Sequence, residues 1–328
     1  MTGRYLVTGG AGFVGSHLVL ALLRGGANVT ILDDLTTGHE RAVPKGAQFV
    51  RGSVADPDAL ARAFSQGPFD AVFHFASLTL VGESMREPVR YIAENVAGAA
   101  ALVQACVTNG VTRIVVSSTA NLFAEPARIP IDEDEAVIPG SPYGESKAML
   151  ERILYWADQI HGLRGACLRY FNAAGADHDG SAGEDHRPET HLIPLVLDAA
   201  AGRRPALTVF GDDYPTADGT CIRDYIHVAD LATAHLAVLE PLRTRSVRYN
   251  LGIGQGHSVR EVIAAAEAVT GMKVPHTIGP RRAGDPAVLV AASARIRREL
   301  GWQPRFERLE TIVSHAWAWR KANPNGYG

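Results

Sequence analysis

Short strand patterns that are apolar at almost every position alternate with helical patterns in the first half of this chain. Strands are expected at Arg4–Thr8, Asn28–Leu32, Gln48–Arg51, Ala71–Ala76, Arg113–Ser118 and Arg164–Tyr170. Helices are expected between them at Gly15–Arg24, Pro57–Ser65, Val89–Asn109 and Tyr143–Ile160. Strands of this kind lie in a sheet that is covered on both faces. The alternation therefore predicts an α/β fold with a doubly wound parallel sheet and right-handed crossovers.

The pattern changes after Asn172, where residues 173–188 are rich in Gly, Asp and His and are predicted to form a loop. Further elements are expected at Leu192–Ala201, Leu207–Phe210, Val228–Leu239 and Val259–Thr270, followed by a basic loop, Gly279–Asp285, and a terminal helix that carries tryptophan. We expect a Rossmann domain from residues 1–171 with about 228–253, and a smaller α/β substrate domain from 172–227 with about 254–328.

Composition excludes several classes of protein. The 328 residues are 46% hydrophobic and 20% charged, as in ordinary globular proteins. The net charge of −3 gives no general attraction to nucleic acid or to an anionic membrane. No apolar run is long enough to span a bilayer, and no signal-peptide pattern precedes the first strand. The three cysteines fit no metal or redox spacing, so we expect reduced thiols and a cytoplasmic protein.

A glycine-rich segment, TGGAGFVGSH, lies directly between the first strand and the first helix. Gly9, Gly12 and Gly15 permit a tight turn, and the start of the helix offers backbone N–H groups to a pyrophosphate. The second strand ends at Asp33, where a carboxylate would accept hydrogen bonds from an adenosine ribose. Asp34 follows and would repel a 2′-phosphate. The segment predicts a dinucleotide site that prefers NAD to NADP.

The segment SPYGESK opens a helix in which Tyr143 and Lys147 share one face, four residues apart. A tyrosine ionises near pH 10, which is too high for a base at neutral pH. The Lys147 ammonium and a positive nicotinamide ring would stabilise the phenolate and lower the pKa of Tyr143. The strand before this helix ends in Ser117, Ser118 and Thr119. This arrangement predicts a catalytic Tyr/Lys pair behind a Rossmann half.

The glycine motif, the SST strand end, YxxxK and RYFN resemble the extended short-chain dehydrogenases/reductases. The longer segments HFASLTLVGES, RYFNAAGA, FGDDYPTADGTCIRDYIHV, YNLGIGQGHSV and RRAGD together resemble the UDP-glucose (UDP-galactose) 4-epimerases. The resemblance runs from Tyr5 almost to the C-terminus. It implies tightly held NAD, a UDP-sugar substrate and a homodimer formed by the small-residue helix and the catalytic helix.

The resemblance also assigns roles to single residues. Tyr143 takes the proton of the sugar 4-hydroxyl, Lys147 holds the cofactor ribose and tunes the tyrosine, and Thr119 hydrogen-bonds the reacting hydroxyl. The implied NAD-binding residues are Gly9, Gly12, Phe13, Val14, Gly15, Asp33, Asp34, Ser53, Val54, Phe75, Ala76, Ser77, Asn95, Ser117, Tyr143, Lys147 and Tyr170. The implied substrate-binding residues are Thr119, Asn172, His191, Leu192, Phe210, Arg223, Tyr225, Val259, Arg282, Asp285 and Leu289. Arg223 and Arg282 would bind the diphosphate, which suits guanidinium groups.

Several positions depart from the family pattern. Thr79 stands where the family often has a lysine that contacts the cofactor ribose, Phe123 replaces a common tyrosine, and Ser53 replaces an acid that contacts adenine. These changes bear on NAD retention and leave the Tyr/Lys chemistry in place. Leu289 stands at the position that sets the size of the hexose pocket, and its intermediate size implies that N-acetylhexosamines fit as well.

Three other functions were weighed against 4-epimerisation of UDP-hexoses. One is epimerisation of another UDP-sugar, a uronate or a pentose. A nucleotide-sugar 4,6-dehydratase shares the fold, but it carries an Asp-Glu pair where this chain has Ala120 and Asn121, which cannot act as acids. A catalytically silent NAD-binding scaffold would need neither Tyr143 nor Lys147.

A cluster of histidines and acids in the Gly-rich loop includes His178, His186 and His191, with Asp177, Asp179, Glu184 and Asp185 around them. Their spacing matches no regular ligand pattern. The sequence therefore favours a polar surface loop, and no metal is expected.

Overall fold

The computed structural model describes residues 2–282 and 285–328, so that Ala283 and Gly284 of the basic loop lie outside the described residues. The chain forms two compact units, each built from three segments. Unit 1 comprises Met1–Ala124, Ala136–Arg169 and Ala232–Tyr249, and unit 2 comprises Glu125–Glu135, Tyr170–Leu231 and Asn250–Gly328. Among the described residues, no helix is both long enough and apolar enough to cross a membrane.

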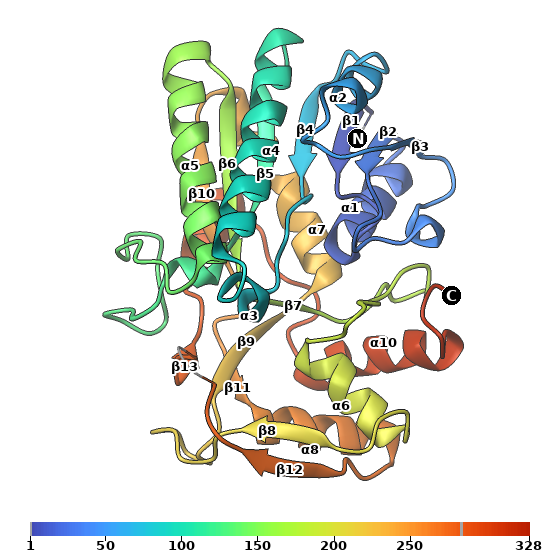
Figure 1. Ribbon diagram of the computed structural model, residues 1–328, viewed down its shortest axis with the longest axis vertical. Coiled ribbons are helices and arrows are strands. Elements are labelled where there is room, and N and C mark those ends of the chain that lie inside the picture. Colours follow the sequence, from blue (N-terminus) through green and yellow to red (C-terminus); the bar gives the residue numbers. More distant parts are fainter. Residues whose placement is uncertain (1, 283–284) are drawn as a thin grey trace. The chain divides into compact units, whose positions relative to one another are not determined.

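A seven-stranded sheet in the order β10-β6-β5-β4-β1-β2-β3 forms the centre of unit 1 (Figure 1). The pairs β2–β3, β1–β2, β1–β4 and β4–β5 are all parallel. The chain order reverses between β1 and β4, which is the switch point where doubly wound sheets bind ligands. The strands are β1 (Arg4–Thr8), β2 (Asn28–Asp33), β3 (Gln48–Arg51), β4 (Ala71–His74), β5 (Arg113–Thr119), β6 (Arg164–Tyr170) and β10 (Val247–Leu251).

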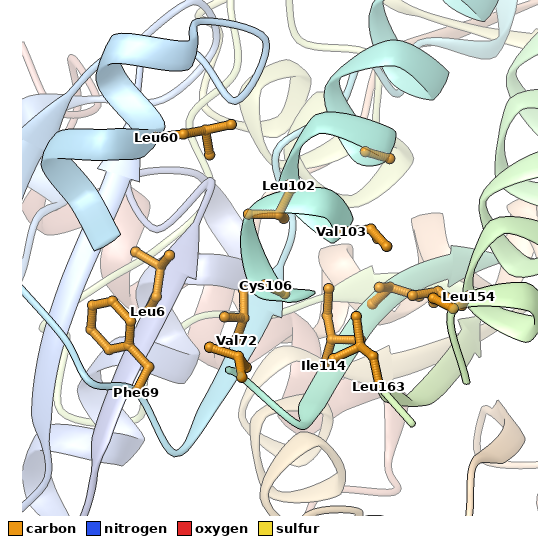
Figure 2. Close-up of a cluster of buried hydrophobic side chains, with 14 of the residues drawn as sticks. Leu6, Leu60, Phe69, Val72, Leu102, Val103, Cys106, Ile114, Leu154 and Leu163 are labelled. Carbon is orange, nitrogen blue, oxygen red and sulfur yellow. The ribbon is translucent and has the colours of Figure 1, made fainter. Parts of the chain in front are cut away.

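One face of this sheet carries the largest apolar cluster shown in Figure 2. Side chains from three helices meet side chains from β1, β4 and β5, so that each buried Leu or Val contributes about 1.5–3 kcal/mol through burial. The helices are α2 (Pro57–Phe64), α4 (Pro88–Thr108) and α5 (Pro142–His161). The contacting residues include Leu60, Leu102, Val103, Cys106 and Leu154 on the helices and Leu6, Val72 and Ile114 on the strands.

Two further helices contact residues of the sheet, and a short helix connects β4 to α4. Helix α1 (Phe13–Arg24) contacts β1 and β2 and buries Leu18 and Leu22. Helix α7 (Val228–Ala237) brings the His235 ring to within 4.9 Å of the Phe75 ring, measured between centroids. The short helix is α3 (Val81–Ser84).

Unit 2 contains a four-stranded sheet and a two-stranded sheet. Strand β9 (Ile222–His227) pairs with β7 (Asn172–Ala174) and β13 (Val288–Leu289) in parallel and with β11 (Gly256–Ser258) in antiparallel orientation. Strands β8 (Leu207–Phe210) and β12 (His276–Gly279) form the parallel pair. The helices are α6 (Leu192–Ala200), α8 (Val259–Thr270), α9 (Ala294–Leu300) and α10 (Leu309–Ala322).

The core of unit 2 lies among α6, α8, α10 and strands β8 and β9. Val196 of α6, Val262 of α8 and Val313 of α10 are all fully buried. Helix α8 begins where Ser258 accepts a hydrogen bond from the Glu261 N–H while the Glu261 carboxylate accepts one from the Ser258 N–H. This capping box fixes the start of the helix.

The sequence predicted the alternating elements of unit 1 and the α/β class, and both predictions are confirmed. The predicted domain boundaries differ at one segment, because Glu125–Glu135 belongs to unit 2 and not to the Rossmann unit. Its backbone explains this placement. Ile131 donates to Val290 O and accepts from Ala292 N–H, and the Glu133 carboxylate accepts from Asn250 N–H.

Candidate active site

The turn between β1 and α1 contains three glycines, and the structure gives different reasons for them. Gly9 has a φ of +73°, and a Cβ there would lie 2.5 Å from Ala76 N. A Cβ on Gly15 would lie 2.1 Å from Gly9 O. Gly12 has an extended backbone with φ −85° and ψ 175°, and its Cβ would meet only Gly9 O, at 3.4 Å. Folding therefore requires glycine at positions 9 and 15, whereas Gly12 leaves open space at the start of α1, where a phosphate could approach.

Asp33 closes the same turn from the end of β2. Its Oδ2 accepts a hydrogen bond from Ala11 N–H at 2.9 Å, and its Oδ1 accepts one from Leu35 N–H, also at 2.9 Å. Burial raises the pKa of the Asp33 carboxyl, while these two backbone donors act in the opposite direction. Each carboxylate oxygen keeps further acceptor capacity, so the predicted contact with a ribose hydroxyl remains chemically available. Asp34 beside it is exposed.

Helix α5 places the predicted catalytic pair. Ser141 caps the helix by accepting a hydrogen bond from Gly144 N–H, Pro142 occupies the first turn, and Gly162 ends the helix in the left-handed conformation. Tyr143 and Lys147 lie on its buried face and are 7% and 1% exposed. The Lys147 Nζ lies 5.9 Å from the centroid of the Tyr143 ring. The structure thus confirms that the two side chains come together.

The Lys147 ammonium is held by two acceptors from different elements. Nζ donates to Ser77 Oγ at 2.9 Å and to Ser117 O, at the end of β5, at 3.0 Å. Burial lowers the pKa of Lys147 to about 7. His74 at the end of β4 is buried too, and burial followed by the charge of Lys147 lowers its pKa to about 3. A neutral His74 accepts or donates at Thr8 Oγ1, 2.8 Å away, and leaves Lys147 as the one cation of this cluster in the described chain.

The ionisation of Tyr143 differs from the prediction made from the sequence. Burial raises its pKa to about 12, and a hydrogen bond from the Thr119 side chain acts in the opposite direction. Lys147 therefore does not lower the pKa of the phenol through the groups of the chain alone. The physical reason is that removing the ring from water disfavours the phenolate, and the nearby ammonium is itself close to neutral. Of the two predicted causes, the positive charge of a bound nicotinamide remains.

Asn95 of α4 was predicted to bind the cofactor, and its amide is already engaged by the chain. Its Oδ1 accepts from Leu78 N–H at 2.8 Å, and its Nδ2 donates to Leu78 O and Ser146 Oγ, both at 3.0 Å. Ser146 in turn donates to Tyr143 O at 2.7 Å. Asn95 therefore ties the segment after β4, which carries Ser77, to the catalytic helix. The structure gives it a positioning role.

A buried ion pair that sequence reasoning missed anchors α5 to the sheet. Arg169 of β6 is fully buried and donates to both carboxylate oxygens of Glu151, at 2.8 and 2.6 Å. Ser118 Oγ of β5 donates to the same carboxylate at 2.7 Å. Glu151 lies one turn after Lys147 on the same helix, and this spacing from the catalytic lysine is the signal that could have identified it.

The remaining predicted cofactor residues lie after the ends of successive strands. Parallel strands bring their carboxyl ends to one edge of the sheet, so the residues that follow them share that edge. Phe13 and Val14 form the first turn of α1, Ser53 and Val54 follow β3, Phe75 and Ala76 follow β4, and Tyr170 ends β6. Their contacts with a cofactor stay predictions.

Unit 2 brings five of the predicted substrate residues onto one small sheet. Arg223 of β9 donates to the Asp285 carboxylate at 2.5 Å. Leu289 of β13 is the register partner of Arg223, and Asn172 of β7 is the register partner of Tyr225. Leu289 and Tyr225 are buried, and the Arg223 side chain is 12% exposed.

The other predicted substrate residues of unit 2 lie around this sheet. The Arg282 guanidinium lies 4.1 Å from the centroid of the Phe210 ring, a cation–π contact at the end of β8. Leu192 and Val259 are the first residues of α6 and α8 and pack against the core of the unit. Their roles in binding a UDP-sugar stay predictions.

The His- and acid-rich loop before α6 is more ordered than the sequence suggested. Glu184, His186 and His191 come together with Glu189, a residue that the sequence analysis did not include. Glu184 is 4% exposed, so the prediction of a polar surface loop is wrong for this residue. His191, predicted to line the nucleotide site, directs its Nδ1 to Glu184 Oε1 at 2.5 Å.

Comparison with known proteins agrees with this geometry. Residues 5–252 match the model of the NAD dependent epimerase/dehydratase family. The chain belongs to this family. The predicted resemblance is thereby confirmed, and it extends beyond the matched residues to proteins that are similar over nearly their whole length.

A UDP-glucose 4-epimerase from Halalkalibacterium halodurans is 49% identical to this epimerase/dehydratase family member over 98% of the chain and 97% of the relative. The crystal structure of UDP-glucose 4-epimerase from Brucella ovis in complex with NAD superimposes with a TM-score of 0.93 at 43% identity, covering 96% of this chain and 98% of that one. The enzyme from Bifidobacterium longum in complex with NAD⁺ and UDP gives a TM-score of 0.94 at 37% identity, covering 98% and 99%.

Proposed function

We propose that this protein is an NAD-dependent 4-epimerase that interconverts UDP-glucose and UDP-galactose. The observation that carries the proposal is the buried group formed by Tyr143, Lys147 and Thr119 at the carboxyl ends of the strands. The full-length similarity to UDP-glucose 4-epimerases supports this function over a dehydratase or a silent scaffold.

The residues present fit NAD. Gly12 leaves space at the N-terminus of α1, where backbone N–H groups favour a pyrophosphate, and Asp33 stands at the end of β2 for the ribose hydroxyls. When bound, NAD supplies a carbon that accepts a hydride from the sugar and later returns it. Asp34 adds a second negative charge at the ribose end and favours NAD over NADP.

The chain's own residues control the proton. Tyr143 removes the proton of the sugar 4-hydroxyl while Thr119 holds the reacting oxygen, and the sugar becomes a 4-keto sugar. Tyr143 returns the same proton when the ketone is reduced from its other face, so the configuration at C4 inverts with no net oxidation. Lys147 is fixed by Ser77 and Ser117 and stabilises the phenolate. Exclusion of water keeps the keto sugar from leaving before it is reduced.

Arg223 and Arg282 are proposed to hold the diphosphate of the nucleotide, and Asp285 sets the position of Arg223 through their ion pair. Phe210 supports Arg282 through the face of its ring. Leu289 is proposed to line the hexose pocket. Because it is intermediate in size, N-acetylhexosamines are expected to be accepted as well; an assay with UDP-N-acetylglucosamine that shows no turnover, while UDP-glucose reacts, would remove this part of the proposal.

The activity is tested by offering purified protein UDP-galactose and analysing the products by chromatography. UDP-glucose is expected. A 4-keto-6-deoxy sugar would indicate a dehydratase, turnover only of uronates or pentoses would indicate another epimerase, and no product would indicate a scaffold. Tyr143→Phe is expected to lower kcat by roughly 10²–10⁴-fold, since it removes the proton-transfer group. Inversion at the parental rate in this variant would contradict the mechanism.

We also propose a homodimer formed through α4 and α5. Exposed apolar side chains on these helices include Val89, which is 79% exposed, Trp156 at 55% and Ile160 at 68%. Apolar exposure on this scale favours association of a second copy. Light scattering is expected to give twice the mass of the chain, and Val89→Glu with Ile160→Glu is expected to give the monomer. The three free thiols support a cytoplasmic location, which cell fractionation would test.

A further inference from the structure

A group of four metal-ligand side chains lies in unit 2, in the loop between β7 and α6. Glu184, His186, Glu189 and His191 each contribute one ligand atom, and these atoms all lie within 4.8 Å of one another. The loop carries none of the predicted nucleotide or catalytic residues except His191. We propose that these four side chains form a structural zinc site.

The distances suit a small tetrahedral ion. The ligand atoms of a tetrahedral zinc lie about 3.3 Å apart, as follows from Zn–N and Zn–O bonds of about 2.0–2.2 Å. His186 Nδ1 lies 3.5 Å from Glu184 Oε1 and 3.6 Å from Glu189 Oε1. His191 Nδ1 lies 3.9 Å from Glu189 Oε1. The separation of 2.5 Å between His191 Nδ1 and Glu184 Oε1 is the one that must widen, and it is a hydrogen-bond distance that an ion would replace.

The Glu184 carboxylate provides a second, independent observation. Its side chain is 4% exposed, and its other oxygen, Oε2, has no hydrogen-bond partner within residues 2–282 and 285–328. Glu189 Oε2 is likewise buried without a partner among those residues. A buried carboxylate oxygen with no partner is costly, because it has lost its hydration and gained nothing in exchange. A divalent cation bound by these carboxylates would compensate for the lost hydration.

The loop is held in place by the C-terminal part of the same unit. Gly183 N–H donates to Tyr327 Oη at 3.0 Å, and Tyr327 N–H donates to the Asp185 carboxylate at 2.9 Å. Arg320 of α10 donates to Glu184 O at 3.2 Å. A Cβ on Gly183 would lie 2.1 Å from the Trp319 ring, so the backbone runs directly against α10. The backbone around Glu184 is therefore fixed before any ion binds.

The donor set selects the metal and its role. Two imidazoles with two carboxylates suit zinc, whereas magnesium and calcium prefer oxygen alone. Two negative charges and two neutral rings balance a divalent ion. All four positions come from the protein, which is the arrangement of a structural site and not of a catalytic one. The ion would join the start of α6 to the loop that α10 supports.

The first test measures metal content in untagged, full-length protein. After exhaustive dialysis against buffer without chelator, one equivalent of zinc per chain is expected by plasma mass spectrometry. Removal with a chelator is expected to lower Tm, and one equivalent of added Zn²⁺ is expected to restore it. Zinc at background level together with no change in Tm on addition of Zn²⁺ would overturn the proposal and leave an ion-pair cluster of imidazoles and carboxylates.

Variants identify the ligands. His186→Gln and Glu184→Gln are each expected to weaken zinc binding by at least about 10-fold. His178→Gln is the matched control, because His178 lies in the same loop, is exposed, and is not in the group. Its zinc affinity is expected to equal that of the parent protein, and parental affinity in both ligand variants would overturn the assignment. If a ligand variant does not fold, Co²⁺ in the parent protein decides the matter: the intense visible band of tetrahedral cobalt supports the site, and its absence overturns it.

Discussion

The ion pair between Arg169 and Glu151 makes a quantitative prediction about stability. Arg169 is fully buried, the Glu151 side chain is 12% exposed, and both carboxylate oxygens accept from the guanidinium. Glu151→Gln preserves the shape but leaves one acceptor oxygen, and its amide NH₂ would face a guanidinium donor. Removing one partner of a buried pair costs about 3–5 kcal/mol, because the remaining charge is left uncompensated.

This loss converts into a measurable fall in Tm. A change of 1 kcal/mol shifts Tm by roughly 2–4 °C in domains of 150–250 residues, so Glu151→Gln is expected to lower Tm by roughly 6–20 °C. Thermal denaturation followed by circular dichroism measures it. Glu94→Gln is the control, since Glu94 and Arg90 form an exposed i,i+4 pair at 2.8 Å whose loss is expected to shift Tm by no more than about 2 °C.

A double variant separates the charge from the packing. Glu151→Leu combined with Arg169→Met removes both charges and fills the space with apolar groups, so its Tm is expected to lie above that of Glu151→Gln. If Glu151→Gln and the exposed control Glu94→Gln gave the same Tm, burial would not be what makes the pair important, and the reasoning would be refuted.

Two further predictions concern the cofactor turn and the catalytic lysine. Gly12→Ala is expected to leave Tm unchanged and to weaken NAD binding in calorimetry, because its Cβ has space in the folded chain; Gly15→Ala is expected to lower Tm, because its Cβ would lie 2.1 Å from Gly9 O. Equal NAD affinity in Gly12→Ala and the parent would contradict the role given to this turn. Burial lowers the pKa of Lys147 to about 7. In protein without bound NAD, the unfolded chain therefore binds more protons than the folded chain between about pH 7 and pH 10, and stability contributed by this residue rises with pH in that window. The Tm of the parent relative to Lys147→Met is expected to increase from pH 7 to pH 9.5, and a flat difference would contradict the burial argument.

The first half of the fold was predictable because its signals are local. Each strand from β1 to β6 is a short apolar run bounded by turns, and the sheet that contains them follows from their alternation with helices. Tyr143 and Lys147 were predictable for the same reason, since four residues along a helix give the same face whatever surrounds it. The direction of the Tyr143 pKa was not predictable, because it depends on burial by distant segments.

The second half depends on pairings between residues far apart in the sequence. Strand β9, with the sequence IRDYIH, contains two charged residues and pairs with β7, β11 and β13, each of only two or three residues. No periodicity reveals such strands. The approach of Glu189 to His186 and His191 was missed for a related reason, because the loop before α6 has no regular geometry from which ligand spacing could be read.

The division of unit 1 into three segments has a consequence for synthesis of the protein. Strand β10 lies at the edge of the seven-stranded sheet, beside β6, yet it is not made until the chain has reached Val247–Leu251. The Rossmann unit therefore cannot close its sheet on the ribosome when its first 169 residues emerge, although these contain six of the seven strands. A nascent chain in that interval exposes the edge of β6, and a protein truncated after Arg169 would carry that unpaired edge permanently, with aggregation as the expected result.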